Sequence, residues 1–225
     1  MFLTRMQLNP ARRVARALLG SPQAMHAAVL AGFPDARPTS DGRILWRLDT
    51  YQDHRTVLYV ASPEKPDFTH LLEQFGWPTT SAWDTKSYAP LLDSLRIGQR
   101  WQFRLAANPV HSVRLKGWSD TKPVGHVTVK QQEQWLLDRA PRLGFRIADD
   151  VGPTGEPDFA VVARMSRRFD RKGSKVTLVT ATYEGHLEVT DPAVLRHALT
   201  HGIGRAKAYG CGLLTLARPR QGSGS

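Results

Sequence analysis

The spacing of apolar residues along the first part of the chain changes from strand-like to helical and back. Residues 2–8 alternate between apolar and polar side chains, which predicts a β-strand. Two helices are predicted next, over residues 9–20 and 21–32, because apolar residues recur every three or four positions. They begin with Asn-Pro and Ser-Pro, pairs that are typical of helix starts. The elements predicted after them are strands at 43–50 and 55–62, a helix at 67–75 and a weaker strand near 79–88.

A similar order of elements is predicted for the second part of the chain. These elements are strands at 99–109, 145–150 and 159–168, extended chain at 175–189, a last strand at 212–217, and helices at 131–144 and from 191 onward. Two βαββαβ units in tandem, an α+β architecture, are the simplest account of this order. We therefore predict an N-terminal domain at residues 1–93 and a C-terminal domain at 94–219. Residues 220–225 are interpreted as a tag or linker remnant.

Composition and charge indicate a folded protein with a polyanionic partner. The 225 residues are 41% hydrophobic and 23% charged, which is typical of globular proteins. The formal net charge of +11 favours nucleic acid as the partner, and no basic amphipathic helix points to a membrane. Cys211 is the single cysteine, so intramolecular disulfides and an all-cysteine zinc site are excluded. No signal peptide or membrane-spanning stretch is recognisable, and we expect the protein to lie in a reducing cytoplasm.

Residues 201–216, HGIGRAKAYGCGLLTL, place four glycines just before the last predicted strand. Glycine exposes backbone N–H groups and lets another chain approach closely, because no Cβ blocks the way. Together with Arg205 and Lys207, the glycines Gly202, Gly204 and Gly210 are predicted to bind an RNA phosphate chain. Neither the dinucleotide fingerprint nor the P-loop pattern is present. The alternative interpretation is a glycine helix cap followed by a bulge.

A second cluster of positive charge lies between two strand-like runs, at residues 164–175. A turn at Gly173 predicts a hairpin whose basic tip grips the phosphates of an RNA groove by shape. The alternative is a solvated run of charges. The predicted RNA-binding residues of this hairpin are Arg164, Arg167, Arg168, Arg171, Lys172 and Lys175. In the less regular segment 111–126 they are Arg114 and Lys116.

Several segments together resemble the CasE family of endoribonucleases, which cut precursor CRISPR RNA in type I-E systems. They are LTRMQLNPARR (3–13), MH (25–26), LWRL (45–48), FRLAANP (103–109) and GIGRAKAYGCGLL (202–214), in order over nearly the whole chain. The resemblance implies two ferredoxin-like, RRM-like domains that bind the stem-loop of a CRISPR repeat RNA. It also implies cleavage without a metal or cofactor, a glycine-rich loop beside the active site, and retention of the product with the other subunits of the Cascade complex.

The resemblance also implies that His26 is the catalytic residue. Cleavage by the neighbouring 2′-hydroxyl needs a proton acceptor or donor and positive charge at the phosphate, and histidine suits this chemistry near neutral pH. Spacing alone favours an ordinary surface histidine, one of eight in the chain. Gln23 stands where some family members have a tyrosine, and residues 27–33 contain no counterpart of a family lysine. The candidates for the missing charge are Arg12, Arg13, Arg205 and Lys207.

Other functions compete with this one. A stem-loop RNA-binding subunit of the same fold, without catalysis, is the main alternative. A metal site is disfavoured: His197 and His201 are four residues apart, as in zinc proteases, but Ala198 stands where that motif has its glutamate. The acidic stretch at 149–158 is rich in turn residues and is interpreted as a solvated loop. The tryptophans at 46, 101 and 135 fall on apolar stripes and are predicted to lie in the core.

Overall fold

A computed structural model describes residues 1–77, 83–114, 121–149, 156–171 and 174–219. The chain forms two compact units. Unit 1 comprises residues 1–94 and 199–213, and unit 2 comprises residues 95–198 and 214–225. Within the described residues the protein is an α+β fold whose sheets are antiparallel, which confirms the predicted structural class.

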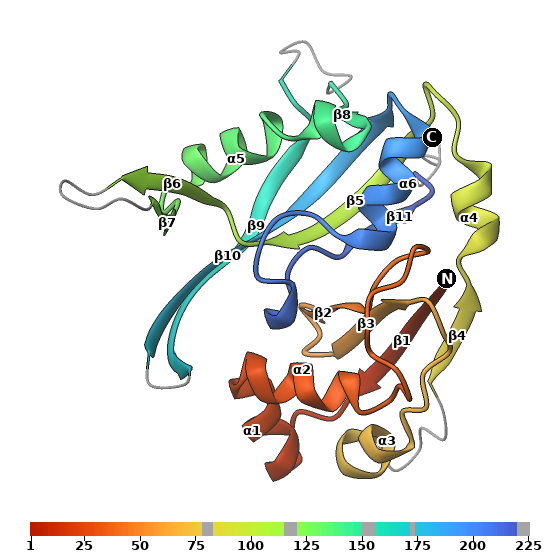
Figure 1. Ribbon diagram of the computed structural model, residues 1–225, viewed down its shortest axis with the longest axis vertical. Helices are drawn as coiled ribbons and strands as arrows, with labels where there is room; N and C mark the ends of the chain where they lie inside the picture. Colours follow the sequence, from red (N-terminus) through yellow and green to blue (C-terminus); the bar gives the residue numbers. More distant parts are fainter. Residues whose placement is uncertain (78–82, 115–120, 150–155, 172–173, 220–225) are drawn as a thin grey trace. The chain divides into compact units, whose positions relative to one another are not determined.

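Unit 1 is built on a four-stranded antiparallel sheet in the order β2-β3-β1-β4 (Figure 1). Its described elements are β1 (Phe2–Leu8), α1 (Arg13–Gly20), α2 (Pro22–Leu30), β2 (Leu45–Thr50), β3 (Thr56–Ser62), α3 (Thr69–Phe75), β4 (Asp84–Ser87), α4 (Ala89–Ser94) and the 3-10 turn η2 (Lys207–Tyr209). Most of the predicted elements are confirmed, within a few residues at their ends. The short helix α4 was not predicted, because that region was interpreted as the boundary between domains.

The core of unit 1 lies between its helices and one face of the sheet. Alternate residues of β1, such as Met6 and Leu8, are buried there against Met25 and Val29 of α2. The serine before α2 caps this helix as predicted: Ser21 Oγ accepts a hydrogen bond from the Ala24 N–H at 3.2 Å. Helix α2 is therefore fixed in place by its cap and by its buried stripe.

Helix α1 differs from its prediction at both its start and its inner face. It begins at Arg13 rather than at Asn9, because Asn9 Oδ1 accepts a hydrogen bond from the Ala11 N–H in a turn that precedes the helix. Ala15 is buried, but its neighbour Val14, one of the apolar residues whose helical spacing predicted this helix, is 53% exposed. Val14 therefore lies outside the core face of α1.

Unit 2 contains a five-stranded antiparallel sheet, in which β11, β5, β10 and β8 follow one another and β9 also pairs with β10. The described elements are β5 (Arg100–Ala107), β6 (Val110–Arg114), β7 (Thr121–Gly125), α5 (Val129–Leu137), the 3-10 turn η1 (Ala140–Leu143), β8 (Phe145–Ile147), β9 (Phe159–Arg171), β10 (Ser174–Val189), α6 (Pro192–His201) and β11 (Leu214–Ala217). Trp101 and Trp135 are buried here, as predicted, and so is Trp46 in unit 1.

Strands β9 and β10 form the long hairpin that the basic segment predicted. Their pairing runs from Arg171 opposite Ser174 down to Phe159 opposite Gly185, with a bulge at Thr182/Tyr183. Residues of β10 before position 181 pair with β9 alone, because β5 pairs with β10 only from position 181 onward. The distal part of the hairpin is therefore a two-stranded ribbon that extends past the rest of the sheet (Figure 1).

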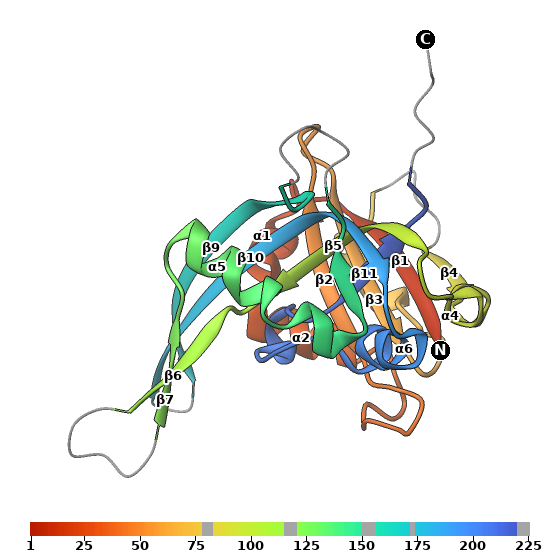
Figure 2. The ribbon, with the colours of Figure 1, turned by 90° about the horizontal axis from the view of Figure 1, so that it is seen from above.

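A second hairpin, β6–β7, was not predicted. Its strands pair from Val110 opposite Gly125 to Arg114 opposite Thr121, and it projects from the sheet of unit 2 (Figure 2). All the residues of its two strands are exposed or only partly buried. A ribbon without a buried face needs no alternation of apolar and polar residues, so the pattern used to find the other strands is missing.

Candidate nucleic-acid interface around His26

The glycine-rich segment belongs to unit 1, where it folds around the edge strand β2. The predicted C-terminal domain, residues 94–219, would have placed it with unit 2. Alternate residues of a strand face opposite sides of a sheet, and the segment contacts both sides: Gly202 lies against Leu45, and Gly210 lies against the ring of Trp46. The Ile203 N–H donates to the Gly212 carbonyl at 2.9 Å and closes the base of this loop.

The interpretation of a glycine as a helix cap is supported by the backbone at Gly202. Gly202 directly follows α6 with φ +79°, the left-handed conformation of a helix cap. Gly210 also has φ +79°, and a Cβ there would lie 2.7 Å from Trp46 Cζ3. Glycine at position 210 is therefore required by backbone conformation and by contact with the indole. The need for glycine at position 210 is thus explained by its contact with Trp46, without any contact to RNA.

A buried arginine secures the end of the segment to the sheet. Arg47 and Asp49, each 2% exposed, form an ion pair with an N–O distance of 2.8 Å. The same guanidinium donates a hydrogen bond to the Leu213 carbonyl oxygen at 2.9 Å. Leu213 in turn packs with Leu45 and Ala61 on this face of the sheet. The loop is thus fixed at a carbonyl that would otherwise lose its hydrogen bond on burial.

His26 projects from α2 next to the Trp46 face of β2. The Trp46 indole N–H donates a hydrogen bond to His26 Nδ1 at 3.1 Å. The two rings are stacked, with centroids 6.5 Å apart and planes inclined by 23°. No partner of His26 Nε2 is present among the described residues, and His26 is only partly buried. One ring nitrogen is therefore held by the protein, and the other is available to a ligand.

The positive charge of Arg43 acts on this histidine and on Lys207. Burial lowers the pKa of His26, and the nearby charge of Arg43 lowers it further. Burial and Arg43 lower the pKa of Lys207 in the same way, although Lys207 Nζ donates to the Gly204 carbonyl at 2.6 Å. Arg43 Nε is buried and has no hydrogen-bond partner within the described part of the chain. Cations that raise one another's free energy in this way are stabilised by a bound anion.

The site described so far consists of His26, Trp46, Arg43 and Lys207, and the sequence pointed to two of them. Lys207 was predicted from the glycine-rich motif and His26 from the family resemblance. Trp46 was assigned to the core, where its ring does lie, 2% exposed, but its polar N–H was overlooked. Arg43 stood at the start of a predicted strand with no signal of its own. The indole N–H of a buried tryptophan usually donates a hydrogen bond, and this was the one signal in the sequence for a contact at Trp46.

The other predicted residues of unit 1 lie on its surface. Gln23 is exposed on α2, one turn before His26. Arg13 and Arg205 are also exposed, so they are open to a ligand. The Arg12 guanidinium donates to the Glu73 carbonyl oxygen at 2.6 Å and so ties α1 to the end of α3. Arg12 thus has a structural contact that the sequence did not indicate.

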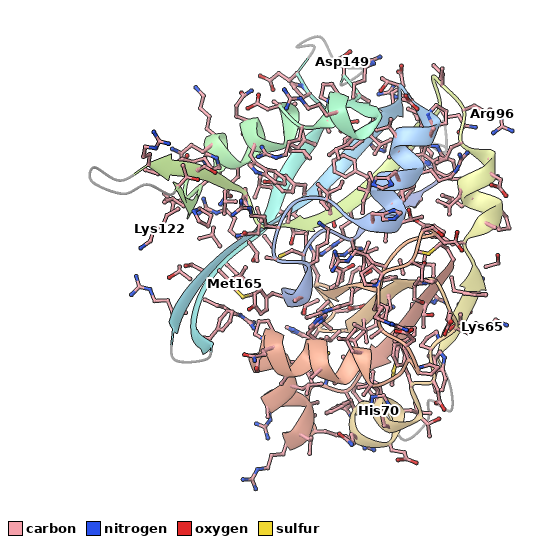
Figure 3. The ribbon with its side chains drawn as sticks, in the orientation of Figure 1. Lys65, His70, Arg96, Lys122, Asp149 and Met165 are labelled. Atoms are coloured by element: carbon pink, nitrogen blue, oxygen red, sulfur yellow. The ribbon has the colours of Figure 1, made fainter. Side chains whose placement is uncertain are left out.

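The predicted basic residues of unit 2 are concentrated on its two hairpins. Arg168 is exposed on β9, and Arg164 is exposed while donating to the Val127 carbonyl at 3.3 Å. Arg167 Nε lies 2.6 Å from the sulfur of Met165 on the same strand. Figure 3 shows Met165 on the long ribbon and Lys122 on the second hairpin. The remaining predicted residues are Arg114, exposed at the end of β6; Lys116 and Lys172, outside the described residues; and Arg171 and Lys175, whose side chains are not described.

The alternative metal sites have other partners. His201 Nδ1 is 2.9 Å from Thr200 Oγ1, and Asp158 Oδ2 is 2.7 Å from His186 Nδ1. Asp149 pairs with Arg146 at 3.0 Å. In the described ranges no three His, Cys, Asp or Glu side chains are grouped closely enough to hold a metal ion. None of the helices in these ranges has the length and apolarity needed to cross a membrane.

The fold and the site define an α+β protein in which a histidine with one open ring nitrogen lies near the charge of an arginine that also acts on a lysine, an arrangement suited to an anion. The chain belongs to the family described as CRISPR associated protein, whose model matches residues 1–218.

Two relatives and two solved structures agree with this assignment. CRISPR-associated endoribonuclease Cse3 of Thermus thermophilus is 32% identical over 221 residues, covering 96% of this chain and 100% of the relative. Cascade subunit CasE of Escherichia coli is 28% identical over 201 residues, 76% of this chain and 94% of the relative. A structure of Cse3 bound to 19 nt RNA is 32% identical, with a TM-score of 0.80 over 96% of this chain and 100% of that chain. The Escherichia coli Cas6e structure, 22% identical, shares the fold with a TM-score of 0.66 over 97% of this chain and 100% of that chain.

Proposed function

We propose that this protein is an endoribonuclease that binds the stem-loop of a CRISPR repeat and cleaves precursor CRISPR RNA. After cleavage it stays bound to the product as a subunit of a Cascade complex. The observation on which the proposal depends is His26 with one ring nitrogen open, near the charge of Arg43, which also acts on Lys207. Similarity over 96% of the chain to a protein named endoribonuclease, solved with RNA, supports the same activity.

The chemistry needs little from the protein beyond this group of residues. The 2′-oxygen attacks the adjacent phosphorus, the bond from phosphorus to the 5′-oxygen breaks, and the ends formed are a cyclic phosphate and a 5′-hydroxyl. Negative charge builds on the phosphoryl oxygens in the transition state, where N–H donors and cations stabilise it. His26 supplies a donor or acceptor at Nε2, and Arg43 and Lys207 supply the charge. They take the place of the lysine that residues 27–33 lack.

We further propose that each unit is a ferredoxin-like domain. In unit 1 the sheet order β2-β3-β1-β4, with helices after the first and third strands, is the order of a βαββαβ unit. Unit 2 has the equivalent order β11-β5-β10-β8 if β8 and β9 count as one interrupted strand, since both pair with the same edge of β10. The predicted domain limits follow this scheme except for the glycine-rich loop.

The long ribbon of unit 2 is proposed to hold the RNA stem. A two-stranded ribbon with exposed arginines, such as Arg164 and Arg168, has the dimensions and charge to follow phosphates along a groove. Because such contacts address the backbone, they position a stem-loop without selecting its bases.

A non-catalytic RNA-binding subunit remains the second candidate, because Gln23 cannot titrate and stands at the position of a family tyrosine. Cleavage of a repeat hairpin in EDTA separates the two functions. His26→Ala is expected to slow cleavage by about 10²- to 10⁴-fold and to leave hairpin affinity unchanged. His197→Ala, at an exposed histidine of α6, is the matched control and should cleave normally.

A substrate with one 2′-deoxy sugar before the scissile phosphate completes the experiment. It should bind the wild-type protein as well as the all-ribose hairpin does and resist cleavage. Cleavage of this substrate, or full activity of His26→Ala, would overturn the mechanism. Tight binding without any cleavage by the wild-type protein would establish the binding subunit instead, and loss of activity in EDTA would indicate a metal-dependent nuclease.

A further inference from the structure

The hydrogen bond between Trp46 and His26 determines where the histidine has its proton. An indole N–H is a donor only, so His26 Nδ1, 3.1 Å away, must accept with its lone pair. A neutral imidazole has one N–H, and here it must therefore be at Nε2. The nitrogen that faces a ligand is then a donor rather than an acceptor.

Core packing and the glycine-rich loop keep Trp46 in the position that makes this bond. The indole is 2% exposed and packs in the core that includes Met25 of α2. Gly210 of the glycine-rich loop lies against its six-membered ring, so the ring has no room to shift toward the loop. Since α2 is fixed by its own cap and core contacts, the two ring planes are held at 23°.

We propose that Trp46 is a positioning residue for His26: its indole N–H holds Nδ1 as an acceptor, so that His26 meets the RNA phosphate with an N–H donor at Nε2. This rests on the function proposed above and assigns the role of His26 within it. A base at Nε2 would need its lone pair there, which puts a proton on Nδ1 and sets two N–H groups against each other. With Trp46 in place, His26 stabilises charge on a phosphoryl oxygen and does not take the 2′-hydroxyl proton.

The reaction step balances without proton transfer to the histidine. The 2′-oxygen forms its bond to phosphorus, the 2′-hydroxyl proton passes to water, and the 5′-oxygen leaves with the electron pair of the broken bond and takes a proton from water. His26 keeps its Nε2 proton throughout. The elements around His26 have several charged and titratable groups. They are Arg43, ahead of β2; Arg47 and Asp49 of β2; Lys207 and Tyr209 of η2; and Arg13 and Arg16 of α1, since both η2 and α1 pack against α2.

The first test needs no RNA. Nitrogen-15 NMR of the histidine rings in the free protein should show His26 Nε2 protonated and Nδ1 bare at neutral pH. Trp46→Phe keeps an aromatic ring but removes the donor, so both tautomers should appear and the pKa of His26 should rise. Trp101→Phe, which removes the N–H of another buried tryptophan, should change neither readout. Protonated Nδ1 in the wild-type protein would overturn the proposal even if Trp46→Phe fails to fold.

The second test asks what the donor does during cleavage. Glutamine at position 26 can donate through its amide and cannot act as a base. Loss of one donor to a developing oxyanion usually slows a reaction by roughly 10²- to 10³-fold. Because His26→Gln retains a donor, it should cleave at least about ten-fold faster than His26→Ala. The wild-type rate should also not decrease as His26 becomes protonated. Equal rates for the two variants, or a rate that falls with the NMR-measured protonation of His26, would overturn the donor role.

The two tests separate this inference from the proposed function. A wild-type protein that binds RNA without cutting it would end the proposed function, while the NMR result on the tautomer would stand. If the protein cleaves RNA but its His26 Nε2 has no proton, the proposed function is retained and the positioning role of Trp46 is overturned.

Discussion

Replacing Gly210 by alanine tests the physical link between the glycine-rich loop and the catalytic site. The substitution adds one methyl group at a position where the backbone has φ +79° and the ring of Trp46 is in contact. If the loop holds Trp46, and Trp46 holds His26, this methyl group should impair cleavage without removing any group that touches RNA. Gly98→Ala is the matched control: its φ is +81°, but a Cβ there would meet nothing within 4 Å.

The magnitude follows from these two environments. A non-glycine residue in the left-handed region costs about 1–2 kcal/mol, and both variants should lose this much stability. At position 210 the new Cβ would lie 2.7 and 2.9 Å from two carbons of Trp46, inside the optimal contact distance of about 3.5–4.0 Å. Because the indole is 2% exposed, relief requires overpacking of the core, at about 1–3 kcal/mol. Gly210→Ala should therefore lose about 2–5 kcal/mol in total.

Urea denaturation measures the stability loss, and single-turnover cleavage of a repeat hairpin measures the effect on His26. Conditions far below the unfolding transition keep both variants folded during the cleavage assay. Gly210→Ala should be less stable than Gly98→Ala and should cleave slowly, while Gly98→Ala cleaves at the wild-type rate. Equal stability losses together with normal cleavage by Gly210→Ala would refute the link, because the methyl group would then have been accommodated without moving Trp46.

Three further predictions concern the stem contact, the buried ion pair and pH. Arg168→Ala should reduce the slope of log affinity against log salt by about 0.7 to 0.9, whereas an unchanged slope means that this charge stays solvated in the complex. Arg47→Leu removes the ion-pair partner of the buried Asp49 and the donor to the Leu213 carbonyl, and should cost about 3–5 kcal/mol in urea denaturation; a loss below 1 kcal/mol would contradict that estimate. Because the pKa of His26 is lowered on folding, the unfolded chain binds more protons below its ordinary pKa of 6.5. The free energy of unfolding should thus fall as pH decreases below 6.5, and less steeply in His26→Gln; identical pH dependence in both proteins would count against it.

The elements that the sequence predicted well are those with one buried face. The strand at 2–8 and the helix that begins at Ser21 show their periods clearly, since each packs against a core. The ribbon β6–β7 has no such face, and α4 has only six residues, too few for a helical period to show. What failed was therefore the detection of elements whose stability comes from pairing or from a neighbouring chain segment.

The candidate site was harder to predict because it depends on contacts between distant positions. His26 and Trp46 are 20 residues apart, and the loop that holds Trp46 follows about 160 residues later in the chain. No local sequence pattern predicts contacts between residues so far apart in the chain. Only the resemblance to a family therefore pointed to His26. Arg43 shows the same limit: at the start of a predicted strand an arginine is ordinary, and its effect on His26 appears only once the sheet and α2 are packed.

The loss of the family lysine is explained if charge at the phosphate matters more than the element that supplies it. A cation stabilises an oxyanion by its distance and orientation, whatever part of the chain delivers it. Arg43 directly precedes the strand that contains Trp46, and Lys207 lies in the loop that contacts Trp46. The residue that orients His26 and the charges beside it thus share one packed structure, in which β2 is the common support. A substitution in the glycine-rich loop should accordingly change catalysis through β2 even where the loop itself does not touch the RNA.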